Sequence, residues 1–506
     1  MWFVTCALGV VALAMTAQQR PSLETQNVSY PYGWSKWLPV PGSDPSEPPR
    51  NASKSQCDTF TDCYSCANAG SWLPGSHCRW CPLHNDLSCH AEGSLLNKCN
   101  ASTQIIDPSR CPAQPTARKP VVIVPGIVGS NIQAKLNKPS VVQPLCSKTS
   151  DWYYAWLESF EVAPDAVKCL FDNLKLKHLG EGNVTNNDGV TTRIADYGGI
   201  GDIRCAMPKT AAACNTTVNW GYALDQLQAA GYSPGVNLFG APYDFRYGPK
   251  SWFRKEFPQL KALIEKAYTT NNDTKVVITS ISLGGPYFHL FLTHFVDPAW
   301  KQKYVDSWVS MSSLWNGATQ VAQMLTAGLG WDGISWIKPQ VFREGVRNWP
   351  AMIFMLPFPY DDVNGTHVDD TYITSSNRSY KASDMGQAVL DAGLPDTAAI
   401  LQSISQYRKS TTPPGVKTYC WYGHGIDTAA SLSFTGSDLS DFDAMTVHME
   451  DGDGTVQHSS LRVCEDWVGQ SEFETIVKTW FNVSHTGFQK EPEALKELLQ
   501  IATGQV

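Results

Sequence analysis

A serine in a tight, small-residue turn is the first feature of this sequence that could do chemistry. Ser282 lies in the run Ser-Ile-Ser-Leu-Gly-Gly at 280–285, after an apolar run and before a helix-like pattern. A nucleophile elbow requires small residues two positions before and two positions after the nucleophile, because a strand turns there directly into a helix. Ser280 and Gly284 occupy those positions. An ordinary loop between a strand and a helix would look similar, so the turn alone does not establish catalysis.

Two residues further along the chain are of the types that activate such a serine. A serine hydroxyl is a weak nucleophile and needs a histidine base that a carboxylate orients. Asp453 lies in a glycine-rich turn after a β-like run at 445–449, and His485 lies in a loop before a helix predicted at 491–501. Taken singly, Asp-Gly-Asp-Gly could bind calcium or simply turn the chain, and a loop histidine is usually solvated. The order Ser282, Asp453, His485 is that of an α/β-hydrolase triad, so we predict these three as catalytic.

An attacked ester carbonyl also needs two backbone N–H donors for its developing negative charge. In α/β-hydrolases, one donor is the residue after the nucleophile and the other comes from the loop that follows an early strand. We therefore predict an oxyanion hole formed by Leu283 and Ile127, the latter in the Pro-Gly-Ile-Val-Gly loop at 125–129. This chemistry requires no metal and no organic cofactor.

The elements that must position these residues alternate in type from Lys119 onward. Apolar runs at 120–124 and 275–279 predict buried strands, and apolar residues at three- and four-residue spacing over 253–268 predict a helix. Short connections between strand, helix and strand favour a mostly parallel sheet covered on both faces. We predict an α/β-hydrolase domain over 118–506, in which a family resemblance, carried by motifs given below, implies a cap or lid and membrane-binding insertions.

Composition narrows the class of protein. The chain has 506 residues, of which 42% are hydrophobic and 17% charged, which excludes disorder as its main state. Its formal charge is -8 and it has no block of basic residues. Nucleic acid is therefore not an expected partner.

The N-terminal region predicts entry into a secretory pathway. Residues 1–17 are apolar and uncharged and end in small residues, which favours a cleaved signal peptide over a membrane anchor, because a spanning helix needs about 20 residues. A proline-rich linker follows at 18–52. Fourteen cysteines remain beyond Cys6. We expect a secreted or endomembrane-lumen protein, with lysosome or vacuole among the destinations, and nine sequons agree, at Asn27, Asn51, Asn100, Asn183, Asn215, Asn272, Asn364, Asn377 and Asn482.

Eight cysteines crowd into 53–113, which is too short a segment to be held by hydrophobic burial alone. Disulfides are the natural prediction, although the C-x2-C spacing at Cys63/Cys66 and Cys78/Cys81 also suits zinc. With Trp80 inside it, this segment resembles the small cysteine-rich module of plexins, semaphorins and integrins. The resemblance implies a rigid spacer through which a protein partner could bind, and the cysteine pairing is left open.

Over about 119–500 the sequence is similar to the lecithin:cholesterol acyltransferase family, which includes lysosomal phospholipases A2 that also acylate ceramide. The resemblance is carried by 121–139, the Ser282 turn, Gly-Ala-Pro-Tyr-Asp-Phe-Arg at 240–246, the Asp453 turn and His485. It implies two cystines, Cys146–Cys169, which closes a membrane-binding loop, and Cys420–Cys464. Cys205 and Cys214 fall in what looks like an insertion and are expected to pair. Ile127 stands where the lysosomal enzymes carry an aspartate.

The resemblance implies a serine-dependent enzyme that cleaves a fatty acyl ester from glycerophospholipid and passes the chain to a sterol, ceramide, another lipid alcohol or water. Its partners would be a phospholipid membrane or lipoprotein surface and the acceptor alcohol. An esterase or peptidase of the same fold is one alternative. A catalytically silent lipid-binding or adhesion protein is another.

Aromatic side chains predict where this protein would touch lipid. The loop at 143–175 contains a helix-length run, Asp-Trp-Tyr-Tyr-Ala-Trp-Leu at 151–157, and we predict that Trp152, Tyr153, Trp156 and Leu157 enter the interface. The alternative is that these side chains pack on the core. A lid region is predicted at 315–350, with glycines for hinge freedom and with Trp331 and Trp336 for lipid contact.

Overall fold

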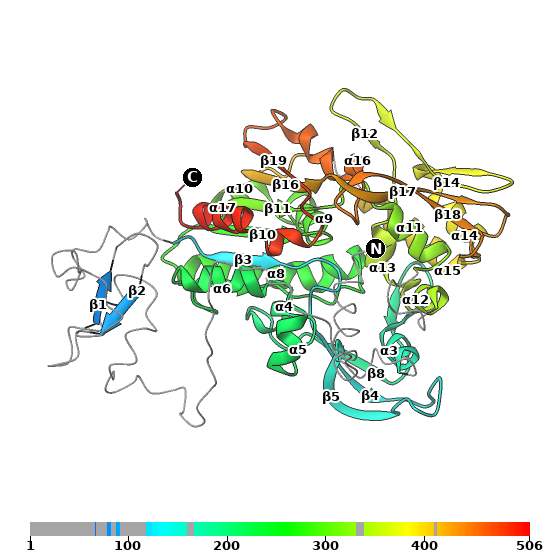
Figure 1. Ribbon diagram of the computed structural model, residues 1–506, viewed down its shortest axis with the longest axis horizontal. Coiled ribbons are helices and arrows are strands. Elements are labelled where there is room, and N and C mark those ends of the chain that lie inside the picture. Colours follow the sequence, from blue (N-terminus) through cyan, green and yellow to red (C-terminus); the bar gives the residue numbers. More distant parts are fainter. Residues whose placement is uncertain are drawn as a thin grey trace, which may run out of the picture. The chain divides into compact units, whose positions relative to one another are not determined.

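The computed structural model describes residues 118–158, 166–329, 338–408 and 412–505, together with Cys66, 78–81 and 88–91 (Figure 1). The signal peptide predicted at 1–17 and the linker predicted at 18–52 lie outside the described residues. Trp331 and Trp336 of the predicted lid lie outside them as well.

A six-stranded sheet with the order β19-β16-β11-β10-β3-β9 forms the centre of the large unit. All five pairings in it are parallel. Strands β3 and β10 are buried at every position, which explains why they read as continuous apolar runs rather than alternating ones. The six strands are β3 (Val121–Val124), β9 (Leu238–Gly240), β10 (Val276–Ile281), β11 (Val305–Met311), β16 (Thr418–His424) and β19 (Thr475–Phe481).

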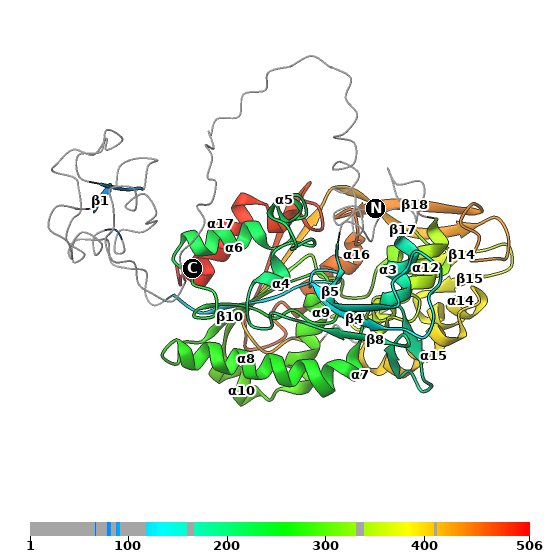
Figure 2. The ribbon, with the colours of Figure 1, turned by 90° about the horizontal axis from the view of Figure 1, so that it is seen from below.

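Helices cover both faces of this sheet. Figure 2 shows α6 (Gly221–Ala229) and α17 (Pro492–Ala502) on one side, and α8 (Phe257–Thr270) and α10 (Pro298–Tyr304) on the other. Helix α8 buries Phe257, Leu260 and Ile264, which are the residues whose spacing predicted it. A parallel sheet between two helical layers is the predicted α/β-hydrolase architecture, and that prediction is confirmed.

A second sheet, with the order β15-β14-β17-β18, forms a cap together with α11 (Thr319–Thr326), α14 (Met385–Asp391) and α15 (Pro395–Ile404). Its longest strands, β17 (Ile426–Phe434) and β18 (Met445–Gly452), form an antiparallel hairpin, and β14 (Thr371–Thr374) and β15 (Ser379–Lys381) complete it. Strand β18 ends directly before Asp453, so the cap delivers the predicted acid.

A third sheet joins β5, β4 and β8 in that order. It consists of β4 (Ile132–Asn137), β5 (Thr149–Trp156) and β8 (Val190–Arg193), and α3 (Val167–Leu174) follows β5. The aromatic run that begins at Asp151 therefore lies in a strand, β5, up to Trp156, although its length would also suit a helix. Aromatic side chains suit a pleated surface that is half buried, which is how β5 lies beside β4.

Few residues of the cysteine-rich segment are described. Strands β1 (Cys78–Cys81) and β2 (Ser88–Ala91) pair antiparallel, and Cys66 forms a disulfide with Cys89. Among the helices of the described residues, none combines the length and the hydrophobicity that a membrane span requires.

Candidate active site

Ser282 sits at the sharp turn between β10 and α9 (Gly284–Leu290), as the sequence predicted. Its φ is 57°, a left-handed conformation that non-glycine residues rarely adopt. Gly284 is needed two positions later, because a Cβ there would lie 2.7 Å from the carbonyl oxygens of Val124 and Pro125. Ser282 Oγ is buried and has no hydrogen-bond partner among the described residues. The fold thus presents a strained serine whose oxygen is not used for structure.

Asp453 and His485 form a buried pair. His485 Nδ1 lies 2.7 Å from Asp453 Oδ2, and the side chains are 1% and 0% exposed, respectively. The other carboxylate oxygen accepts hydrogen bonds from the backbone N–H groups of Thr455 (3.0 Å) and Val456 (2.8 Å). The His485 amide also donates to the Asp453 carbonyl at 2.8 Å. These bonds fix the carboxylate and present it to one ring nitrogen of the histidine.

Each member of this pair follows the end of a strand. Asp453 comes directly after β18, and the next amide, that of Gly454, donates to Thr428 Oγ1 of β17 at 2.8 Å. His485 follows β19, whose seven residues are all in register with β16. The cap hairpin therefore positions the acid, and the edge of the central sheet positions the histidine.

One cavity of about 50 Å³ brings Ser282, His485 and Ile127 together. The loop that carries Ile127 lies against the serine, since a Cβ on Gly126 would come within 2.9 Å of Ser282 Cβ. Within the described chain, the backbone amides of Ile127 and Leu283 donate no hydrogen bond to another residue. Two amides beside the serine are thus available as hydrogen-bond donors.

Four further residues line this cavity and were missed by the sequence analysis: Asn219, Trp220, Thr486 and Gln489. Asn219 and Trp220 precede α6, and nothing in their local sequence marks them as site residues. Thr486 and Gln489 follow His485 within one helical turn, so their closeness to the histidine was the one available signal.

Comparison with known proteins identifies the relatives of this chain. A family model described as lecithin:cholesterol acyltransferase matches residues 153–409 and 403–495. The chain belongs to the lecithin:cholesterol acyltransferase family. This membership confirms the resemblance carried by the Ser282 turn and the segments around Asp453 and His485.

Named relatives agree with this family. The lysosomal phospholipase A and acyltransferase of Rattus norvegicus is 30% identical over 70% of this chain and 83% of its own length. The human protein of the same name is 28% identical over 78% and 93%, and the phosphatidylcholine-sterol acyltransferase of Gallus gallus is 28% identical over 75% and 90%. A solved structure, that of a Tle4-Tli4 complex, has a TM-score of 0.41 at 14% identity and covers 77% of this chain and 99% of its own.

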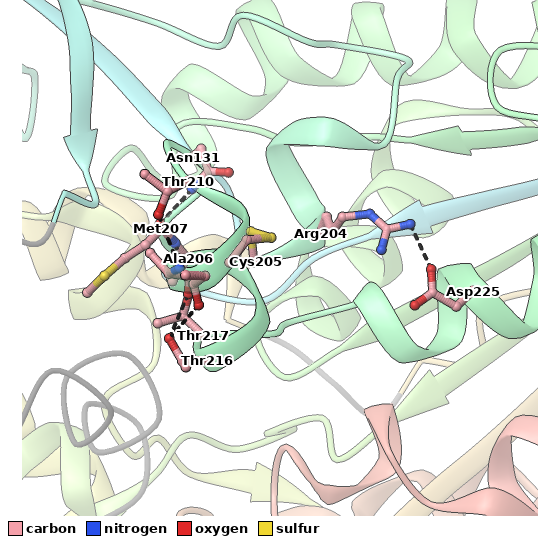
Figure 3. The surroundings of a disulfide bond; sticks show 12 residues. Asn131, Arg204, Cys205, Ala206, Met207, Thr210, Thr216, Thr217 and Asp225 are labelled. Atoms are coloured by element: carbon pink, nitrogen blue, oxygen red, sulfur yellow. Dashed lines mark hydrogen bonds and ion pairs between the residues drawn. A yellow bond between two sulfur atoms is a disulfide. The ribbon is translucent and has the colours of Figure 1, made fainter. Parts of the chain in front are cut away.

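The three disulfides predicted for the acyltransferase domain are all formed: Cys146–Cys169, Cys205–Cys214 and Cys420–Cys464. Figure 3 shows the Cys205 cystine, with Ala206 and Met207 next to it and Thr210, Thr216 and Thr217 around the short helix that it closes. Arg204, directly before it, forms an ion pair with Asp225 of α6 at 2.9 Å. The insertion is thereby tied to the helical layer of the main sheet.

The structure corrects part of the predicted lipid contact. Trp156 is 3% exposed and Leu157 is fully buried, so neither side chain is available to a bilayer. Both belong to the core because β5 turns inward at its end, beside β4. Tyr153 is half-buried, and its hydroxyl accepts a hydrogen bond from Asn173. Trp152 is 36% exposed and lies under the guanidinium of Arg193, so it alone of the four remains a candidate for the interface.

Proposed function

We propose that the protein cleaves a fatty acyl ester from a glycerophospholipid and transfers the acyl group to a lipid alcohol or to water, with Ser282 as nucleophile. Its family makes it an enzyme of the phospholipid acyl hydrolase and acyltransferase kind. The observation that carries the proposal is the cavity shared by Ser282 and His485, in which Asp453 holds the far nitrogen of the histidine ring.

In the proposed mechanism, Ser282 Oγ attacks the ester carbonyl while His485 Nε2 takes its proton. Asp453 keeps Nδ1 protonated and stabilises the imidazolium that forms. The oxyanion is held by the amides of Ile127 and Leu283 until the lysolipid leaves with the proton from His485. An acceptor hydroxyl or water then gives its proton to His485 and attacks the acyl-enzyme, and the bond to Ser282 Oγ breaks as His485 returns the proton to that oxygen. No metal or organic cofactor takes part in these steps.

We place lipid contact at the tip of the β4–β5 hairpin. Val142 and Leu145 are 49% and 53% exposed there, next to the Cys146–Cys169 cystine that fixes the tip to α3. Trp152 adds a partly exposed ring on β5. Exposed apolar side chains on a rigid tip bury area in a bilayer or lipoprotein surface at little cost in chain entropy. Trp331 and Trp336 remain predicted contributors from the lid.

We infer that the protein is secreted or works in the lumen of an endomembrane compartment, and that it associates peripherally with membranes. The cystines of the domain support an oxidising compartment. In this reading residues 1–17 are the signal peptide, 18–52 the linker and 53–113 a cysteine-rich spacer module, which offers a surface for a protein partner. The acyltransferase domain then spans 118–506.

Turnover of labelled phosphatidylcholine vesicles, with and without sterol or ceramide, tests the proposal. Ser282→Ala should abolish acyl release and fluorophosphonate labelling while vesicle binding persists. Ser312→Ala is a matched control, because Ser312 is also buried, also has a positive φ (45°) and also follows a strand of the central sheet. Turnover that survives in Ser282→Ala would favour another nucleophile. Labelling without phospholipid turnover would favour an esterase or peptidase, and neither activity would favour a silent binding protein.

A further inference from the structure

The loop that carries Ile127 is held in a strained conformation. Val128, the next residue, has a φ of 56°, although a β-branched side chain disfavours left-handed backbone. Such a conformation persists only where the surroundings over-determine it. Tyr243 secures the start of the loop through a hydrogen bond from its hydroxyl to the Pro125 carbonyl at 3.2 Å. Something must also hold the end of the loop at Val128.

Trp156 provides that hold. Its indole Nε1–H donates to the Val128 carbonyl at 3.0 Å across 28 residues of sequence. The ring is buried and packs edge-on against Phe245, with the ring centroids 5.7 Å apart. Because this carbonyl belongs to the peptide after Val128, the bond fixes ψ of Val128. It thereby stabilises the left-handed conformation that orients the preceding peptide groups, including the Ile127 amide.

The backbone of Trp156 is itself anchored. Asn131 Nδ2 donates to the carbonyls of Trp156 (3.3 Å) and Ala206 (2.9 Å), and the Leu157 amide donates to the Ala206 carbonyl at 3.1 Å. Figure 3 shows Asn131 beside Ala206, next to the Cys205 cystine. The end of β5, the cystine-closed insertion and the strained loop are therefore one connected polar network around a buried indole.

We propose that Trp156 is a positioning residue for catalysis, which holds the Ile127 amide in place through the Val128 carbonyl. The inference rests on the proposed function, because it assigns the Ile127 amide to the oxyanion. Trp156 touches no reacting atom. Its N–H sets the geometry of a group that does, so its loss should affect the transition state rather than the binding of substrate.

Trp156→Phe tests this, with Trp349→Phe as its matched control. Trp349 is also buried, also packs on Phe245 and also donates its indole N–H to a backbone carbonyl at 3.0 Å, but that carbonyl is Leu174. Each change removes one such bond, so both should lower Tm by a similar few degrees. On a soluble short-chain ester, Trp156→Phe should lower kcat about tenfold or more with KM unchanged, since misplacement of an oxyanion donor costs rate. Trp349→Phe should leave kcat as it is.

A second variant addresses the strain directly. Glycine adopts a φ of 56° freely, so Val128→Gly should restore part of the kcat lost in Trp156→Phe. Equal kcat losses in the two tryptophan variants, or no restoration by Val128→Gly, would overturn the positioning role. Those outcomes are distinct from failure of the proposed function, which would appear as turnover retained by Ser282→Ala.

Discussion

Strain at single residues marks the edge of the sheet where the site lies. Val128, Ser282 and Ser312 all have positive φ and follow β3, β10 and β11, respectively. Non-glycine residues in this conformation cost on the order of 1 kcal/mol each, and they cluster at functional sites. The central strands thus end in residues held in unusual conformations by their neighbours.

Asp453→Asn should lower kcat by roughly 10⁴-fold, because an amide at this position stabilises the wrong histidine tautomer and cannot balance an imidazolium. The backbone bonds to the Oδ1 position can persist, so Tm should change little. Steady-state turnover of a soluble ester measures the loss. Combined with Ser282→Ala, the change should add almost nothing, since these residues act as a unit; additive losses would argue against a shared mechanism.

His289, on the helix that follows Ser282, is buried against the ring of Trp467, and its Nε2–H donates to the Thr412 carbonyl at 2.7 Å. Burial lowers the pKa of His289 to about 4. Between pH 6.5 and 4 the unfolded chain therefore binds a proton at His289 that the folded chain does not bind. As the pH is lowered across that window, the free energy of unfolding decreases by at most about 3 kcal/mol.

His289→Gln keeps a donor for Thr412 but does not titrate. The Tm advantage of the wild type over this variant should shrink as the pH falls from 7 to 4.5. Glu256 and Asp202, whose pKa values burial raises, act in the opposite direction, but both proteins contain them and their effect cancels in the difference. A difference in Tm that does not vary with pH would show that His289 titrates alike in both states.

Among the elements, the β4–β5 hairpin has two proposed roles, lipid contact at its tip and positioning of the Ile127 loop at the far end of β5. Its tip exposes Val142 and Leu145, whereas β5 ends in the buried Trp156. The sequence predicted that this segment is special but not which face each side chain takes. The composition shows that aromatic residues are concentrated in this segment. Which of their side chains are exposed depends on the pairing of β5 with β4 and on the hydrogen bond from Trp156 to the Val128 carbonyl. Both contacts are made with residues outside the segment.

By contrast, the nucleophile elbow around Ser282 could be predicted from the local sequence alone. Its requirements are local: an apolar run, small residues two positions either side of Ser282, and a helix-like pattern after it. The cap was not predicted in any detail, because strands of three or four residues such as β14 and β15 carry too little periodicity to be recognised.

Val142→Ser combined with Leu145→Ser should weaken vesicle association by about 2 kcal/mol, roughly 30-fold, from the apolar area no longer buried in lipid. Hydrolysis of a soluble short-chain ester should be unchanged. Vesicle co-sedimentation measures the first effect. Val236→Ser with Leu390→Ser is the control, since these side chains are exposed to a similar degree, 51% and 44%, on other parts of the domain. Equal weakening by both pairs would mean that the hairpin tip has no special contact with lipid.

For the molecule as a whole, the sequons predict where N-glycans would be attached to the surface. All six whose asparagines are described have that asparagine exposed: Asn183, Asn215, Asn272, Asn364, Asn377 and Asn482. Accessible sequons in a chain that enters the secretory pathway are acceptors for N-glycans. The family and the cystines make that pathway the proposed one.

Protein isolated from a secretory host should therefore lose apparent mass when treated with peptide N-glycosidase, and mass spectrometry should locate glycans at these positions. Single Asn→Gln changes identify which sites are used. Asn482 is the most informative, because it lies three residues before His485. An unmodified chain from such a host would contradict the proposed compartment.

His485 follows β19, which is the last strand of the central sheet in sequence order. This order has a consequence for the time at which the protein becomes active. About 200 residues separate Ser282 from His485, and β19 pairs only at the outer edge of β16. At roughly 5–20 residues per second, a ribosome needs about 10–40 s to make that stretch. In the proposed mechanism Ser282 has no base throughout this interval, so a nascent chain that enters the proposed secretory pathway cannot deacylate the membrane that it is crossing.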